Sequence, residues 1–212
     1  MIWLLYLAAA LCSLGSFAYI LLGLPPEASQ GFVQKIFFFH VPAAFTMYAT
    51  LTVACAASIL YLIQRRPAHD FIARAAMRVS FLFACIVIFS GPIWAKPIWG
   101  VYWTWDPRLT TSFVVFVLLI AYLSVRRIFD SLQLPARGAL IGAILSIFAL
   151  LDVPLIHFSV KLWRGIHPSV LKDPNGLPDD YRLGLELMIF SFFLIASCLF
   201  WIFWKIEERK NA

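Results

Sequence analysis

Aromatic and charged side chains gather in residues 96–110, which read KPIWGVYWTWDPRLT. The members that could do chemistry are Trp99, Tyr102, Trp103, Trp105, Asp106 and Arg108. Indole rings placed together make a flat apolar surface, and an arginine beside them can bind an anion. An aromatic belt at a membrane interface is the simpler alternative. A belt scatters its rings over many helix ends, so this density favours a platform for a planar, amphiphilic ligand that carries carboxylates.

Two of the four histidines could bind a metal beside this platform. His40 stands at the start of the second long apolar run, and His167 lies in the polar stretch after the fifth run. Neutral imidazole is a good ligand for iron, and two imidazoles can hold a haem from opposite faces. A single histidine at a membrane boundary is more often a polar anchor. The presence of two on the platform side is what favours a ligand role.

The remaining histidine, acidic and cysteine side chains give weaker indications of a functional site. His69 stands among arginines and is expected at the surface. Asp152 and His157 lie within an apolar run, where we expect a hydrogen-bonded polar contact inside the bundle, with Pro154 bending the helix. Glu186 is expected at the membrane interface. The four cysteines have neither CxxC nor CxxCH spacing, so a disulfide framework, a zinc site and covalent c-type haem are not predicted.

The composition is that of a membrane protein. Of the 212 residues, 62% are hydrophobic and 13% are charged, whereas a soluble domain carries roughly 25% charged residues. The formal charge of +6 lies in short clusters at the ends of apolar runs, which indicates membrane topology rather than a nucleic-acid partner. We expect one membrane domain over residues 1–212.

Six apolar segments could cross a bilayer as helices, since a crossing needs roughly 20 apolar residues. They cover about 2–22, 40–63, 79–95, 108–125, 138–159 and 183–204. They lack the alternation of barrel strands, which leaves helices as the structure that satisfies the backbone in lipid. The first segment has no basic stretch before it and is longer than a signal-peptide core, so we expect an uncleaved span. The predicted fold is an all-α, polytopic bundle of six transmembrane helices.

The charges between the spans predict an orientation. Ten of the seventeen Lys and Arg residues lie in the turns 64–78 and 126–137 and in the tail after residue 204. The positive-inside rule places these segments, and therefore both termini, in the cytoplasm. The outer loops are then 23–39, 96–107 and 160–182. We call the loop 96–107 the Trp-rich loop. His40, His167 and this loop lie on the outer side of the membrane.

The string from Trp99 to Thr110, WGVYWTWDPRLT, resembles the tryptophan-rich WWD signature of the haem-handling protein family. Six spans in 212 residues, a His-Val-Pro at position 40 and an Ile-His-Phe-Ser-Val before a loop histidine are similar to its CcmC branch. The larger CcmF and CcsA branches share the signature but are built differently. Tyr102 departs from the family, which usually has a Trp there, and Asp152 stands where an uncharged polar residue is expected.

The resemblance implies that the chain binds haem b non-covalently, with His40 and His167 as the two axial ligands of the iron. It also implies a ring platform made by Trp99, Tyr102, Trp103 and Trp105. Arg108 would be the partner of a haem propionate, and Asp106 would orient the loop. We expect the two histidines to lie in different loops, which can part by small motions. That layout suits a protein that gives up its haem rather than one that transports electrons.

The resemblance further implies a role in cytochrome c biogenesis at the bacterial inner membrane. ABC transporter subunits, CcmA and CcmB, would deliver haem, and the chain would pass it to the membrane-anchored chaperone CcmE, with the small subunit CcmD assisting release. The chain would thus present haem and not act as an enzyme. Two alternatives stay open: a haem lyase of cytochrome c assembly, which shares the platform, and a transporter subunit without haem, whose Trp loop only anchors the bundle.

Overall fold

The computed structural model describes residues 2–163, 165, 167 and 176–210. Within these residues lie six α-helices: α1 Ile2–Ala18, α2 Phe37–Gln64, α3 Pro67–Trp99, α4 Pro107–Ser131, α5 Pro135–Trp163 and α6 Asp179–Lys210. Two short helical turns, η1 Tyr19–Gly23 and η2 Phe32–Ile36, lie between α1 and α2. In the described part of the chain, six helical segments are long and apolar enough to cross a membrane. The all-α, six-span prediction is confirmed.

Local chemistry sets several of the helix ends. Pro67, Pro107 and Pro135 each open a helix, a position where the missing N–H costs nothing and the fixed φ favours helix. α3 ends at Trp99, and the next residue, Gly100, has a φ of 77°, a left-handed conformation that glycine adopts without strain. The chain can therefore leave α3 sharply and enter the Trp-rich loop.

Helices α2 to α6 extend beyond the predicted spans, because hydropathy marks only the part of a helix that lies in hydrocarbon. α3 continues through Lys96 and Pro97 to Trp99, so the loop between α3 and α4 covers 100–106 rather than 96–107. His40 lies in the first turn of α2 and not in a loop. The prediction that both histidines lie in loops is therefore wrong for His40.

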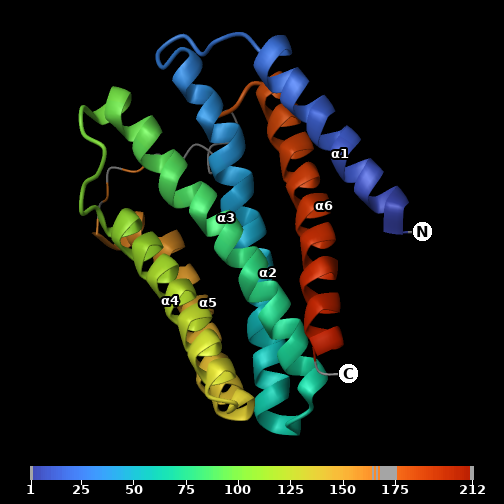
Figure 1. Cartoon of the computed structure of the whole chain (residues 1–212). Helices are drawn as coiled ribbons and strands as arrows, with labels where there is room; N and C mark the ends of the chain where they lie inside the picture. The colour runs from blue at the N-terminus through green and yellow to red at the C-terminus, as the bar shows by residue number, and fades with distance from the viewer. Residues whose placement is uncertain (1, 164, 166, 168–175, 211–212) are drawn as a thin grey trace.

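The helices pack as three neighbouring pairs (Figure 1). α2 packs along α3, α4 along α5, and α1 along α6, and α2 and α3 lie between the other two pairs. The core between them contains Phe38, Met77, Leu119 and Met188, which come from four different helices. The first residues of α1 and the last of α6 point toward the end of the bundle that carries the α2–α3 and α4–α5 turns. The Trp-rich loop lies at the other end.

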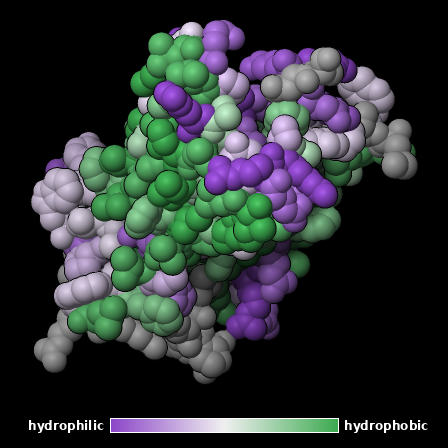
Figure 2. All heavy atoms as spheres, turned by 90° about the horizontal axis from the view of Figure 1, so that it is seen from below, coloured by the Kyte–Doolittle hydropathy of each residue, from purple (hydrophilic) through white to green (hydrophobic). Residues whose placement is uncertain are grey.

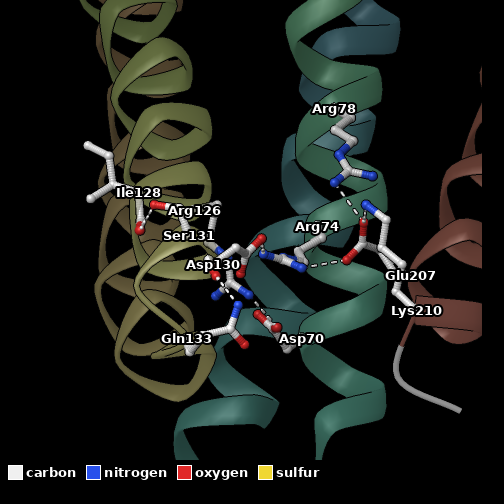
Figure 3. A network of polar contacts seen from close by, with 10 residues as sticks. All are labelled: Asp70, Arg74, Arg78, Arg126, Ile128, Asp130, Ser131, Gln133, Glu207 and Lys210. Atoms are coloured by element: carbon white, nitrogen blue, oxygen red, sulfur yellow. Dashed lines mark hydrogen bonds and ion pairs between the residues drawn. The ribbon is translucent and has the colours of Figure 1, made fainter.

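Ion pairs join three helices at the end opposite the Trp-rich loop (Figure 3). Arg74 of α3 pairs with Asp130 of α4 and, at 2.5 Å, with Glu207 of α6. Arg126 of α4 pairs with Asp70 of α3 at 2.6 Å. The Glu207 side chain is fully buried, and a buried charge that loses its partner is strongly destabilising. This ion-pair network therefore holds α3, α4 and α6 together at this end.

Two glycines let α4 and α5 approach closely. A Cβ atom on Gly138 would lie 2.7 Å from Phe129 Cβ, and one on Gly142 would lie 3.0 Å from the Tyr122 ring and 3.1 Å from Arg126 Cδ. Small residues allow helices to pack closely in membranes. The two glycines of α5 thus make room for the aromatic and arginine side chains of α4.

We expect Gly138→Ala to lower the free energy of unfolding by about 1–3 kcal/mol, because the new methyl group overlaps an atom fixed to the backbone of α4. The thermal unfolding midpoint of the detergent-solubilised protein measures the effect. Gly15→Ala is the matched control, since nothing lies within 4 Å of its Cβ position and Ala favours helix. Equal midpoints for the two variants would contradict this account of the α4–α5 contact.

Candidate functional site

A cavity of about 400 Å³ lies between α2, α3, α4 and α5, at the end with the Trp-rich loop. Its wall includes His40, Trp94, Trp99, Trp103, Arg108 and His167. Five of the eight residues predicted for the site therefore meet on one surface. Most of the other lining residues are apolar, among them Phe37 and Leu109. We refer to it as the aromatic cavity.

His40 is held in place from α3. Its Nδ1 lies 3.0 Å from the Oγ of Ser90, and the Ser90 hydroxyl donates to the carbonyl of Val87 at 3.5 Å. The Ser90 oxygen can therefore accept a hydrogen bond from Nδ1–H of His40. This tautomer leaves the lone pair on Nε2, the nitrogen that would bind a metal. Gly91 lies against the ring, since a Cβ there would be 3.5 Å from His40 Cε1.

His167 lies in the segment after α5 and contacts Arg108 of α4. Arg108 Nη1 lies 3.0 Å from Nδ1 of His167. A guanidinium group only donates, so His167 Nδ1 accepts, and the proton of a neutral ring is then on Nε2. The ring of Trp99 packs edge-on against the imidazole, with 6.4 Å between centroids. Arg108 thus occupies the lone pair that His167 would offer to a metal.

Three indole rings form part of the aromatic surface of the cavity. Trp94 and Trp99 pack edge-to-face with 5.0 Å between centroids. The Nε1 of Trp94 donates to Gln30 Oε1 at 2.9 Å, which fixes that ring. Trp103 packs against Phe113, and its Nε1 is buried without a hydrogen-bond partner in the described part of the chain. A planar apolar ligand would find ring surfaces here from both α3 and the loop that follows it.

Tyr102 and Trp105 do not line the aromatic cavity. Tyr102 is 60% exposed and Trp105 is 73% exposed. Lys96 lies over the Tyr102 ring at 5.3 Å and donates to the carbonyl of Gly100 at 2.9 Å. Trp105 packs edge-on against Trp103. The two exposed rings therefore flank the cavity and face outward from the same end of the bundle.

Asp106 is the last residue of the Trp-rich loop, is buried, and caps α4. Its Oδ1 accepts a hydrogen bond from the backbone N–H of Arg108 at 2.9 Å, which satisfies one of the free donors at the helix start. A Cβ on Gly165 would lie 2.5 Å from Asp106 Oδ2. A larger residue at position 165 would therefore have to displace the carboxylate. Asp106 therefore contacts both the helix that carries Arg108 and the segment that carries His167.

Sequence reasoning missed several residues in or behind the wall, namely Gln30, Gln34, Ser90 and Trp94. Gln34 lines the cavity, and its buried Oε1 has no hydrogen-bond partner among the described residues. Trp94 lies near the end of the apolar run 79–95, five positions before Trp99, and this proximity was the available signal. No sequence signal pointed to Gln30 and Gln34, because a polar stretch between two spans does not indicate which helices it packs against.

The remaining candidates lie elsewhere or behave differently from the expectation. His157 lines the α5 side of the aromatic cavity instead of the bundle interior. Asp152 Oδ2 is buried and makes no hydrogen bond to any described residue, so the expected satisfied contact is not formed there. His69 lies at the opposite end, with Nε2 3.2 Å from Gln64 Oε1. All four cysteines are free thiols, and Glu186 is exposed.

Together these features define a polytopic α-helical membrane protein with an aromatic, imidazole-bearing cavity at one end. The chain belongs to the heme exporter protein C (CcmC) family, whose model matches residues 1–211. The assignment made from the WWD signature is confirmed.

Named relatives support the assignment. The heme exporter protein C of Bradyrhizobium diazoefficiens is 31% identical over 188 residues, which cover 88% of this chain and 69% of that protein. That of Escherichia coli K12 is 31% identical over 178 residues, which cover 82% and 70%. A putative cytochrome c biosynthesis ccmC-like mitochondrial protein of Marchantia polymorpha is 27% identical over 188 residues, which cover 88% and 77%.

Asp106→Ala should lower the free energy of unfolding by roughly 0.5–2 kcal/mol, because the first turn of α4 loses its side-chain acceptor. Asp106→Asn should stay close to the original stability, since Asn caps a helix about as well as Asp does. Unfolding midpoints of the two variants, measured side by side in one detergent, test this. If Asn destabilises as much as Ala, the charge of Asp106 and not its capping bond is what matters.

Proposed function

We propose that the chain binds haem b non-covalently in the aromatic cavity and passes it to a haem chaperone during cytochrome c biogenesis. The supporting observation is that three imidazoles, those of His40, His157 and His167, line one cavity together with three indoles and a guanidinium group. Imidazole nitrogens bind haem iron, indole rings pack against a porphyrin, and a guanidinium group binds a propionate. The names of the relatives, heme exporter protein C and a cytochrome c biosynthesis protein, agree with this role.

The chemistry of the cavity fits this cargo. Its volume of about 400 Å³ lies in the range of ligand sites, roughly 300–1,000 Å³. Gln34 Oε1 and Trp103 Nε1 are buried without a hydrogen-bond partner in the described residues. Buried polar atoms rarely stay unpaired in native proteins, so a ligand with polar edges or bound water would satisfy them. We assign Trp99 and Trp103, with Trp94, to the porphyrin faces.

Arg108 couples the two halves of the proposed site. It donates to His167 Nδ1 and so blocks a lone pair of that ring. A guanidinium–carboxylate bond is charge-assisted and stronger than a bond to a neutral imidazole. When a propionate enters the cavity, Arg108 turns to it and releases His167. The imidazole then binds the iron, so recognition of the carboxylate precedes closure of the second axial position.

The two axial ligands differ in how firmly the fold holds them. His40 belongs to α2 and is hydrogen-bonded to Ser90 of α3. His167 follows the end of α5 and contacts α4 through Arg108. Segments outside helices separate at lower cost than helical ones. In this proposal haem stays on His40 while the His167 side opens toward the acceptor, as transfer requires.

We place the cavity on the periplasmic side of a bacterial inner membrane, with both termini in the cytoplasm. The turns 64–78 and 126–137 and the tail carry ten of the seventeen Lys and Arg residues, and such clusters remain inside. CcmA- and CcmB-like transporter subunits would supply haem, a CcmE-like chaperone would receive it, and a CcmD-like subunit would assist. Tyr102 and Trp105, both exposed beside the cavity, are suited to contact a partner. The role is presentation of haem rather than enzymatic catalysis.

His40→Ala and His167→Ala should each lower the Soret absorbance of the protein purified from haem-replete cells, with haem affinity reduced at least about tenfold, since each removes an axial ligand. Added imidazole should restore part of the absorbance, because it can occupy the vacated position. A merely structural histidine would not be rescued in this way.

His69→Ala is the matched control, since His69 lies at the other end of the bundle. It should keep the full absorbance. A colourless wild-type protein from the same cells would overturn the haem proposal, and so would two histidine variants that bind haem normally.

Arg108→Gln should weaken haem binding by about tenfold or more, because a hydrogen bond to a charged group contributes about 1.5–3 kcal/mol. It should bind haem dimethyl ester as well as the original protein does, since the ester has no carboxylate to lose. Titrations followed in the Soret band compare the two ligands. Arg182→Gln, which changes a cation outside the cavity lining, is the control. If Arg108→Gln weakens the binding of haem and of its ester equally, Arg108 is not the propionate partner.

A further inference from the structure

A second cavity lies beside the ion-pair network and is rich in cations. Five cations line this cavity of about 270 Å³: Arg74, Arg78, Arg126, Arg127 and Lys210. Three carboxylates pair with four of these cations: Asp70, Asp130 and Glu207. Among the described residues, five cations against three carboxylates leave an excess of two positive charges. We refer to this cavity as the basic pocket, and its charge attracts anions.

The pairing inside the basic pocket is uneven. Glu207 is 2.5 Å from Arg74 and 2.6 Å from Arg78, but 3.7 Å from Lys210. Arg126 uses Nη2 for Asp70, whereas its Nε and Nη1 are buried and have no hydrogen-bond partner among the described residues. The Arg126 side chain is only 5% exposed. Buried donors without acceptors are costly, so the described residues supply too few acceptor atoms for the donors of Arg126.

The basic pocket lies where lipid headgroups would be. Arg74 is about two turns inside α3, which begins at Pro67, and Lys210 ends α6. Tyr122 and Leu123 form the part of its wall closer to the bundle centre. Figure 2 views the molecule from this end and shows hydrophilic residues grouped beside hydrophobic ones. A headgroup in the pocket could therefore keep its acyl chains against the apolar sides of the helices.

We propose that the basic pocket binds a phosphate group, supplied by an anionic phospholipid or by free inorganic phosphate. Arginine matches phosphate geometry with paired donors, and basic pockets between transmembrane helices bind anionic headgroups. The phosphate oxygens accept from Arg126, Arg127 and Lys210, the cations with unused donors or weak pairing. A bound phosphate adds acceptors to the ion-pair network and so stabilises the contact between α3, α4 and α6.

The test measures the thermal unfolding midpoint of the full chain in lipid-depleted detergent after addition of phosphatidylglycerol, phosphatidylcholine or inorganic phosphate. We expect phosphatidylglycerol to raise the midpoint and phosphatidylcholine to leave it unchanged. A rise with the anionic lipid alone identifies a headgroup, and a rise with inorganic phosphate identifies a site for the free anion; both support the proposal. No rise with either anion, or an equal rise with phosphatidylcholine, overturns it.

A matched pair of double variants locates the site. Arg127→Gln with Lys210→Gln removes the two most weakly paired cations and keeps the Arg74–Glu207 and Arg126–Asp70 pairs intact. We expect roughly 25-fold weaker binding of the stabilising anion, about fivefold for each cation. Arg66→Gln with Arg137→Gln removes two exposed cations at the same end outside the pocket and should change binding less than about twofold. If both double variants lose anion affinity equally, the anion binds to diffuse surface charge, and the proposed site in the basic pocket is wrong.

Discussion

The lack of water in the bilayer core is the constraint on which this structure depends. Each backbone N–H and C=O there must be hydrogen-bonded within its own helix, and six helices accordingly hold most of the described chain. Irregular backbone, and with it most freedom to build sites, is confined to the helix ends. The two ends of this bundle differ. At one end ion pairs join the helices, and at the other end the helices enclose the aromatic cavity.

α3 connects these two ends. Near its start, Arg74 joins α4 through Asp130 and α6 through Glu207. Near its end, Ser90 holds the ring of His40, and Trp94 and Trp99 line the aromatic cavity. α3 and α4 therefore meet through charges at one end and form facing parts of the cavity wall at the other. At one end, the ion pairs hold α3 close to α4. At the other end, side chains of the same two helices line the aromatic cavity.

Sequence reasoning succeeded where the signal was local. The length of each apolar run predicted six spans, and the string from Trp99 to Thr110 led to the correct family. It failed for His40, because the end of an apolar run is not the end of a helix: α2 begins before the histidine, at Phe37. It also failed for Asp152, whose expected contact depends on the neighbours of α5. In the structure His157 faces the aromatic cavity, and Asp152 Oδ2 is left without a hydrogen bond to the described residues.

By itself, the sequence determined the class of fold, the family and the residue types available for binding. Only the tertiary structure decided which of them meet: Trp94 and Trp103 on the cavity wall, Tyr102 and Trp105 outside it, and Arg74 beside Glu207, 133 positions further along the chain. Helix formation and hydropathy depend on residues that are close in sequence, so a short stretch of sequence is enough to predict them. Which side chains touch depends on the rotation and tilt of packed helices, which no single segment encodes.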